Sequence, residues 1–164
     1  DEIPAITTPY FNFFELDVLC RMGKLTEVLD KIRSYWGGML DLGAVTFWEE
    51  YDPSVPKEEQ YDMYGDHFGK SLCHAWAASP IYFLAKYFAG LDLVNKDGVT
   101  YVLKPQMQYF TDLDCILPVG SDGTVRLAWD GECLEVIADA DGGVLELGEQ
   151  KFSLVRGETR RVKI

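Results

Sequence analysis

Residues 79–103, SPIYFLAKYFAGLDLVNKDGVTYVL, decide the fold of this chain, because one periodicity gives way to another within them. Up to Gly90 the apolar residues recur at the three- and four-residue spacing that is typical of an α-helix. From Val99 to Leu103 the residues are β-branched, aromatic and aliphatic, and Asp97-Gly98 is a typical turn signal. The stretch predicts a helical part that ends near residue 92 and a strand-rich part that follows.

Three segments before this switch show helical periodicity, namely residues 8–23, 25–36 and 71–91. Pro9 suits the first helical position, where its missing N–H loses no helical hydrogen bond. Gly37-Gly38 is expected to end the second helix. Pro80 is expected to break the third segment into a short lead-in and a longer helix that starts near Ser79.

Short β-prone runs separated by Asp-Gly turns follow the switch, at residues 99–103, 115–119, 124–129, 134–137, 144–147 and 151–155. Strands at this spacing favour an antiparallel sandwich or half-sandwich. The predicted fold class is therefore α+β, with a helical domain over residues 1–92 and a β-sandwich-like domain over residues 93–164.

The predicted helices carry much apolar surface and have few partners to bury it against. The sequence starts Asp1-Glu2-Ile3-Pro4, with neither an initiator Met nor a signal-peptide pattern. We therefore expect a fragment of a longer chain, whose helical faces pack on the remainder of that chain or self-associate. Nothing in the sequence distinguishes a cytoplasmic from a periplasmic or secreted location.

Composition excludes several classes of function. A 13% aromatic content indicates folded material, and the net charge of -12, from 27 acids and 15 bases, leaves no basic stripe for nucleic acid. The same acidity disfavours an anionic membrane surface, and no apolar run reaches the ~18 residues of a membrane span. The four cysteines are far apart, so neither a metal site nor a cofactor is expected; they are Cys20, Cys73, Cys115 and Cys133.

Residues 41–69 are expected to form a long irregular stretch rich in aromatic residues, and such loops are usually functional or disordered. Within it, Trp48 is followed by Glu49 and Glu50. An aromatic ring beside carboxylates suits the apolar faces and polar edges of a sugar, and glycoside hydrolysis uses two carboxyl groups. A carboxylate beside an indole fits a general base. Composition alone, however, favours a surface Glu pair flanked by core aromatics.

Two further clusters contain candidate site residues. His74 lies in an apolar helical pattern, where a structural histidine is the commoner interpretation. Ser71 lies nearby, but no Gly-x-Ser-x-Gly elbow accompanies it, which argues against a serine hydrolase. Near the start of the first helix, Phe11 and Phe14 are expected in the core, whereas Tyr10 and Asn12 are expected to be more open.

Together these clusters resemble the end of bacterial α-L-rhamnosidases, glycoside hydrolase family 78. The resemblance rests on four stretches in matching order, residues 6–11, 35–41, 43–49 and 71–76, and covers about residues 1–92. The stretch Gly-Ala-Val-Thr-Phe-Trp-Glu, residues 43–49, is its most specific part, although Val45 stands where a second Thr is expected. Leu117-Pro118 and residues 123–129 resemble, more weakly, the family's closing β-domain.

The resemblance implies an (α/α)6 barrel followed by a β-sandwich, and hydrolysis of terminal α-L-rhamnose with inversion. Glu49 would be the general base that activates water, and the general acid would lie in a segment this chain lacks. Trp48 and His74 would line the sugar pocket, His74 through a hydrogen bond to a sugar hydroxyl, with no metal required. Tyr10 and Glu50 are added as candidate substrate-binding residues from their own positions in the sequence. The isolated fragment would be inactive.

Three alternatives stay open beside this leading interpretation. A non-catalytic carbohydrate-binding module would use the aromatic loop to hold an oligosaccharide, and Glu49 would only accept hydrogen bonds. An assembly element would dock its exposed helical face on a partner chain. A related helical-barrel hydrolase would act on another sugar.

Overall fold

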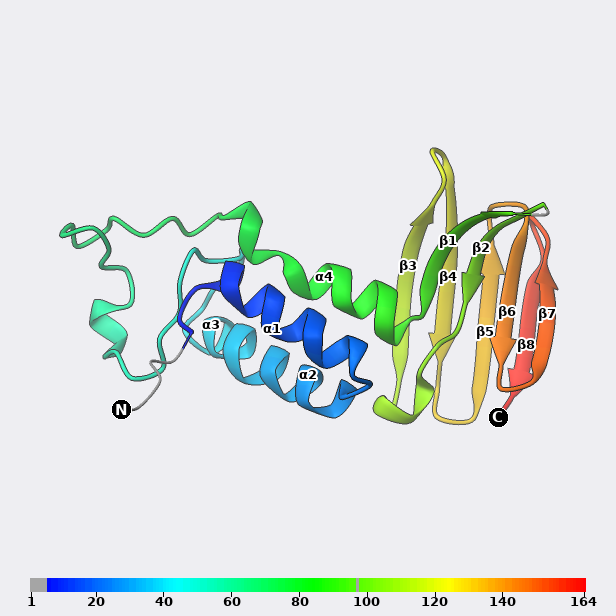
Figure 1. Cartoon of the computed structure of the whole chain (residues 1–164), viewed down its shortest axis with the longest axis horizontal. Helices are drawn as coiled ribbons and strands as arrows, with labels where there is room; N and C mark the ends of the chain where they lie inside the picture. Colours follow the sequence, from blue (N-terminus) through cyan, green and yellow to red (C-terminus); the bar gives the residue numbers. More distant parts are fainter. Residues whose placement is uncertain (1–5, 97) are drawn as a thin grey trace. The chain divides into compact units, whose positions relative to one another are not determined.

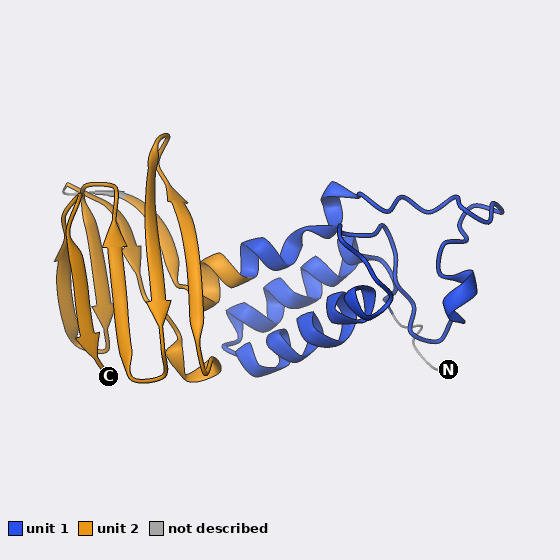
Figure 2. Ribbon diagram, turned by 180° about the vertical axis from the view of Figure 1, so that it is seen from behind, with its two compact units in different colours: residues 1–83 blue, residues 84–164 orange. Residues whose placement is uncertain are grey.

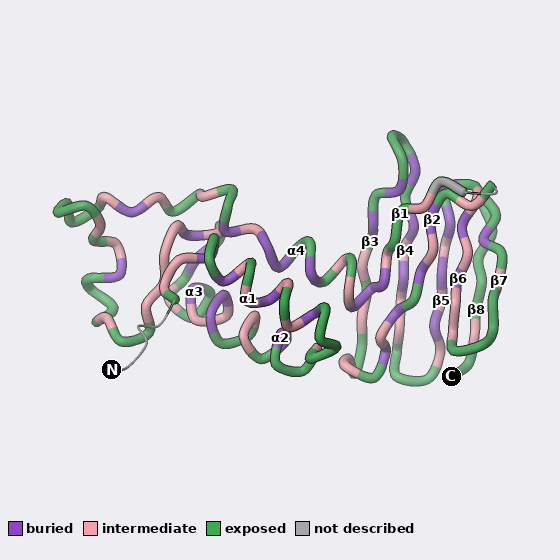
Figure 3. The backbone as a smooth tube through the Cα atoms, in the orientation of Figure 1, coloured by how far each residue is buried: buried purple, intermediate pink, exposed green. Residues whose placement is uncertain are grey.

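The computed structural model of this protein describes residues 6–96 and 98–164, and its α-helices precede its strands (Figure 1). The chain forms two compact units, Asp1–Phe83 and Leu84–Ile164 (Figure 2). Each unit has buried residues of its own (Figure 3). The predicted order of a helical part and then a strand-rich part is confirmed.

The helices of the first unit are α1 (Pro9–Arg21), α2 (Leu25–Lys31), a π-helical segment (Ile32–Trp36), α3 (Gly37–Asp41) and α4 (Ser79–Phe83). Short connections join α1 through to α3, whereas a long, mostly irregular stretch separates α3 from α4. Leu16 of α1, Val28 of α2 and Met39 of α3 are buried together with Phe83 of α4. The helices of the described residues do not by themselves show an (α/α)6 barrel.

The second helix does not end at Gly37-Gly38, which corrects the prediction. Gly37 keeps α-helical angles, with φ -60° and ψ -38°, so the helical run continues. The run ends instead at Asp41, and Gly43 follows with a φ of 92°, which is accessible to glycine and strained for other residues. The N–H of Ala44 donates to the carbonyl of Met39 at 3.0 Å, so that the last turn is satisfied.

The core face of α1 also differs from the expectation. Phe11 and Phe14 are 59% and 50% exposed, whereas Asn12 is fully buried. Phe13, on the adjoining face, packs against Phe83 with ring centroids 5.2 Å apart. The described residues bury one side of the helix, so the aromatic residues around the rest of its girth stay in contact with solvent.

Proline 80 breaks the third helical segment as predicted. A short 3₁₀ helix (Ala75–Ala77) precedes it, and α4 starts at Ser79. A π-helical segment (Leu84–Phe88) then belongs to the second unit, because the Phe88 ring lies 5.6 Å from the Tyr109 ring. The contacts therefore divide the chain earlier than the boundary expected at residues 92 and 93.

The second unit contains two four-stranded sheets, with orders β1-β2-β6-β7 and β3-β4-β5-β8. The strands are β1 (Leu91–Lys96), β2 (Val99–Leu103), β3 (Leu113–Val119), β4 (Gly123–Trp129), β5 (Cys133–Ala138), β6 (Gly143–Leu147), β7 (Gln150–Leu154) and β8 (Thr159–Lys163). Pairing is antiparallel except between β2 and β6, which run parallel. Both sheets contribute to one apolar core, which includes Tyr101 and Leu145 from one sheet and Leu127 and Val136 from the other.

Six strands were expected, and two more are present. β1 follows Gly90 directly, where the sequence suggests only a helix exit, and β8 is too basic to show an apolar alternation. Both segments are strands because their backbones pair with a neighbouring strand, β1 with β2 and β8 with β5. In the part of the chain that the structure describes, no helix is long and apolar enough to cross a membrane.

Candidate functional site

Two stretches that the sequence analysis singled out lie side by side in the first unit. The N–H of Glu49 donates to the carbonyl of Ser71 at 2.9 Å. The N–H of His74 donates to the carbonyl of Phe47 at 2.8 Å. These main-chain bonds hold the Glu49 loop, residues 46–50, against the segment that contains His74. The candidate site therefore has a backbone framework even though both segments are irregular.

The carboxylate of Glu49 accepts one hydrogen bond on each oxygen. The hydroxyl of Tyr64 donates to Oε1 at 2.6 Å, and the N–H of Ser71 donates to Oε2 at 3.0 Å. The ring Nδ1 of His74 lies 4.0 Å from Oε2. The bond from Tyr64, then that from Ser71, lowers the pKa of Glu49, because both favour the charged carboxylate. The side chain is 17% exposed and is thus ionised within reach of solvent.

The carboxylate of Glu50 contacts other residues than that of Glu49 does. Its Oε1 accepts a hydrogen bond from the Thr7 hydroxyl at 2.8 Å, and its Oε2 lies 4.0 Å from Nζ of Lys70. The Lys70 side chain is only 4% exposed, and burial lowers its pKa against the opposing effect of Glu50 and other nearby carboxylates. Glu50 therefore ties the loop to the chain before α1 and offsets a buried cation.

Tyr35 holds the end of the Glu49 loop through hydrogen bonds of its hydroxyl group. Its buried hydroxyl donates a hydrogen bond to the carbonyl of Thr7 and accepts one from the N–H of Tyr51 at 3.2 Å. That N–H also lies 3.0 Å from the Thr7 carbonyl. Burial raises the pKa of the Tyr35 hydroxyl, which keeps it protonated as a donor. Because Tyr51 follows the loop directly, this network fixes where the Glu49 loop ends.

The aromatic residues near Glu49 differ sharply in exposure. Trp48 is only 3% exposed, and its ring packs at 5.6 Å from the Tyr61 ring. Trp76, in contrast, is 67% exposed and makes a T-shaped contact with His74 at 5.5 Å. The Tyr10 ring, 46% exposed, also lies 5.4 Å from the Trp76 ring. The accessible indole of this region is therefore Trp76, which contacts His74, whereas Trp48 is buried within the loop.

The structure brings together Glu49, His74 and, through Trp76, Tyr10. Trp76 lies in the stretch 71–76 but was not predicted as a site residue, and Tyr64 was not predicted at all. The signal for Trp76 was its place two residues after His74. Tyr64 has no such signal, because only the turn of the chain brings it back to the loop.

An apolar hollow of about 450 Å³ adjoins the start of the Glu49 loop, lined by residues that include Trp36, Met39, Leu40, Val45 and Phe47. Val45 is 94% exposed there. No group of three or more His, Cys, Asp or Glu side chains suited to a metal ion occurs among the described residues. The chemistry available at this site is that of an ionised carboxylate, an imidazole and a phenol.

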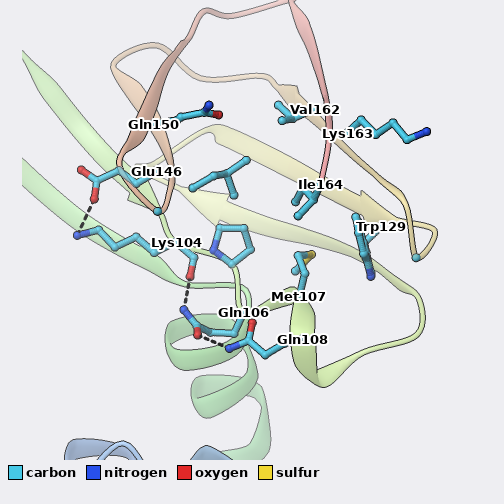
Figure 4. Close-up of a pocket in the computed structure, with 14 residues that line it drawn as sticks. Lys104, Gln106, Met107, Gln108, Trp129, Glu146, Gln150, Val162, Lys163 and Ile164 are labelled. Atoms are coloured by element: carbon cyan, nitrogen blue, oxygen red, sulfur yellow. Dashed lines mark hydrogen bonds and ion pairs between the residues drawn. The ribbon is translucent and has the colours of Figure 1, made fainter.

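A larger cavity of about 800 Å³ lies in the second unit, at one end of its two sheets (Figure 4). Its lining includes Gln106, Gln108, Trp129 and Glu146. These polar groups are engaged: Gln108 donates to Gln106 at 3.0 Å, and Glu146 forms a 2.8 Å ion pair with Lys104. The Glu146 carboxylate in this lining is thus already paired with a cation.

Comparison with solved structures shows a likeness in fold. The chain resembles the crystal structure of the GH78 family rhamnosidase of Bacillus sp. GL1, with a TM-score of 0.68 and 24% sequence identity. The match covers 92% of this chain and 16% of the rhamnosidase chain, so this chain spans a small part of that enzyme's length. No family model and no curated protein matches the sequence. The likeness shows a shared fold over nearly the whole chain.

Proposed function

We propose that this chain is part of a glycoside hydrolase that releases terminal α-L-rhamnose with inversion, and that Glu49 is its general base. The observation that carries the proposal is the environment of Glu49, an ionised carboxylate held by Tyr64 and Ser71. Its Oε2 lies 4.0 Å from the ring of His74, which in turn contacts the exposed indole of Trp76. The likeness to a GH78 rhamnosidase over 92% of the chain supports the same assignment.

The proposed chemistry assigns one defined step to Glu49. A water molecule attacks the anomeric carbon as the bond to the leaving oxygen breaks, and Glu49 accepts the proton that this water loses. The leaving oxygen takes a proton from a carboxylic acid on the opposite side of the sugar. A general base has to be ionised before it acts, and the lowered pKa of Glu49 provides that state.

The acid in this scheme comes from the rest of the enzyme. Inverting sites hold their two carboxyl groups about 6.5–9.5 Å apart, with room for the water. Glu50 is committed to Thr7 and Lys70, which makes it a poor proton donor to a substrate. We further propose that α1 to α4 complete an (α/α)6 barrel with helices of the parent chain, which would carry the acid.

Sugar contacts are proposed for the groups around the carboxylate. Trp76 offers a flat apolar face, Tyr10 extends it, and His74 offers a ring nitrogen to a sugar hydroxyl. Trp48, which the sequence analysis took as the platform, is assigned to support of the loop, because its ring has almost no accessible surface.

Glu49→Gln in the enzyme that contains this chain tests the proposal. We expect kcat on an α-L-rhamnoside to fall by about 10²- to 10⁴-fold while the far-UV circular dichroism is unchanged. Glu58→Gln, in the exposed 3₁₀ helix Lys57–Glu59, is the matched control and keeps full activity. NMR of the first-formed sugar should show the inverted anomer. Turnover close to that of the native enzyme in Glu49→Gln would contradict the proposal.

A carbohydrate-binding module is the second candidate, favoured by the 67% exposure of Trp76. In that case the full-length protein would bind rhamnose-containing glycans and lose binding in Trp76→Ala, yet release no sugar. Release of sugars other than rhamnose would instead indicate a related hydrolase of different specificity.

A further inference from the structure

Tyr64 adopts a backbone conformation that tyrosine rarely takes. Its φ is 57°, which makes it the non-glycine residue with positive φ in the described part of the chain, and Gly65 follows with φ 82°. Met63 and Asp66 on either side exchange main-chain hydrogen bonds of 3.0 Å. The four residues thus form a tight two-residue hairpin turn, whose central positions favour Asn, Asp or Gly. A tyrosine there is strained.

Packing does not explain why a tyrosine occupies this position. The side chain is 80% exposed, and within the described residues it has no aromatic ring partner. Its hydroxyl, however, donates to Oε1 of Glu49 at 2.6 Å. Strained residues persist where the surroundings fix them, and they cluster at functional sites. The contact that Tyr64 makes is with the proposed catalytic carboxylate.

The backbone around the turn is fixed independently of this contact. The N–H of Lys70 donates to the Tyr61 carbonyl at 3.2 Å, which closes the hairpin at its base. At Gly69, an added Cβ would lie 2.1 Å from the carbonyl oxygen of Met63, so the backbones of the two sides of the hairpin are in close contact. The main-chain contacts of the hairpin therefore hold Tyr64 at the position from which its hydroxyl reaches Glu49.

We propose that Tyr64 is a positioning residue for Glu49: the hydroxyl of Tyr64 fixes the orientation of the carboxylate toward the attacking water. The proposal rests on the proposed function of Glu49 and goes beyond it. Each carboxylate oxygen of Glu49 accepts one hydrogen bond, Oε1 from the hydroxyl of Tyr64 and Oε2 from the N–H of Ser71. Each keeps a further lone pair for a water proton.

The electrostatics of the pair agree with this role. The bond from Tyr64 lowers the pKa of Glu49 and raises that of Tyr64, so the donor keeps its proton while the acceptor stays ionised. The other groups that face Glu49 are the Ser71 N–H, the His74 ring and, at longer range, Lys70. All three act in the same direction as Tyr64, and Tyr64 has the largest effect.

Tyr64→Phe tests the proposal, because it keeps the ring and the strained backbone and removes only the hydroxyl. We expect kcat to fall by up to about 100-fold with KM little changed, as for a misplaced catalytic group. The acid limb of the kcat/KM profile should move to higher pH, because Glu49 loses the bond that lowers its pKa. Tyr109→Phe, in the second unit, removes a phenol elsewhere and should leave both readouts unchanged.

Two further measurements separate positioning from folding. Tyr64→Gly relieves the strain of positive φ, so it should unfold at the same or a higher temperature yet show the same shift of the acid limb. Carbon NMR titration of Glu49 should give a higher midpoint in Tyr64→Phe than in the native protein, whether or not sugar is cleaved. An unchanged midpoint and acid limb would overturn the role of Tyr64. Activity in Glu49→Gln would instead overturn the proposed function.

Discussion

The backbone of Gly38 lies directly against the ring of Tyr51. A Cβ added at Gly38 would come within 2.4 Å of the phenol end of that ring, well inside contact distance. Gly37, its neighbour in the same helix, has nothing within 4 Å of the corresponding position. Tyr51 follows the Glu49 loop, so the close approach at Gly38 links α3 to the candidate site.

Gly38→Ala should therefore destabilise the protein, by about 1–3 kcal/mol for an overpacked contact. Gly37→Ala is the matched control, and we expect it to stabilise by about 0.5–1 kcal/mol, since alanine is the better helix former. Urea denaturation of both variants measures the difference. Equal effects of the two substitutions would show that the Tyr51 ring can move aside freely.

Trp36→Phe should cost about 1–3 kcal/mol, because a buried hydrogen bond is lost. The indole Nε1 of Trp36 donates to the carbonyl of Ala77 at 2.8 Å, and Trp36 is 5% exposed. The same substitution at Trp76, which is 67% exposed, should change stability by no more than about 0.5 kcal/mol. Thermal and urea unfolding compare the two variants, and a smaller loss at Trp36 than at Trp76 would contradict the assignment.

Lys70→Met should change how the unfolding free energy varies with pH in the alkaline range. Burial lowers the pKa of Lys70 below its usual 10.5, so the unfolded chain binds more protons between the two values. The unfolding free energy of the native protein then rises with pH across that window, and the contribution from Lys70 is absent in the variant. At neutral pH, where the ammonium is buried at a cost, Lys70→Met should be at least as stable as the native protein.

Urea denaturation at several pH values approaching 10.5 measures this difference. Lys57→Met, at an exposed position, serves as the control and should follow the native curve. A Lys70→Met curve that runs parallel to the native one would mean that Lys70 keeps an ordinary pKa.

The strand unit should fold by itself if it is taken from residue 84. Its apolar core lies within Leu84–Ile164 and includes Ala89, before the first strand. A fragment of residues 84–164 should unfold cooperatively in urea. A fragment of residues 93–164 lacks Phe88, Ala89 and the start of β1, so we expect a lower midpoint or no cooperative transition. Equal midpoints would favour the boundary near residue 92.

The sequence by itself determined the features that depend on neighbouring residues. The helix-to-strand order, the break at Pro80 and six of the strands follow from periodicity, proline chemistry and Asp-Gly turns, all of which act over a few residues. The stretch around Glu49 was equally visible, because its residue types are unusual together. Whether Glu49 acts as a base stays a prediction.

Only the tertiary structure decided what depends on distant parts of the chain. Gly37-Gly38 looked like a helix stop, yet the second glycine makes room for Tyr51. Trp48 looked like a sugar platform, yet it is buried against Tyr61, and Trp76 has the exposed ring. Tyr64 reaches Glu49 because a hairpin turns the chain back. Burial and hydrogen-bond partners are set by segments that meet only in the folded molecule, and no local pattern encodes which segments those are.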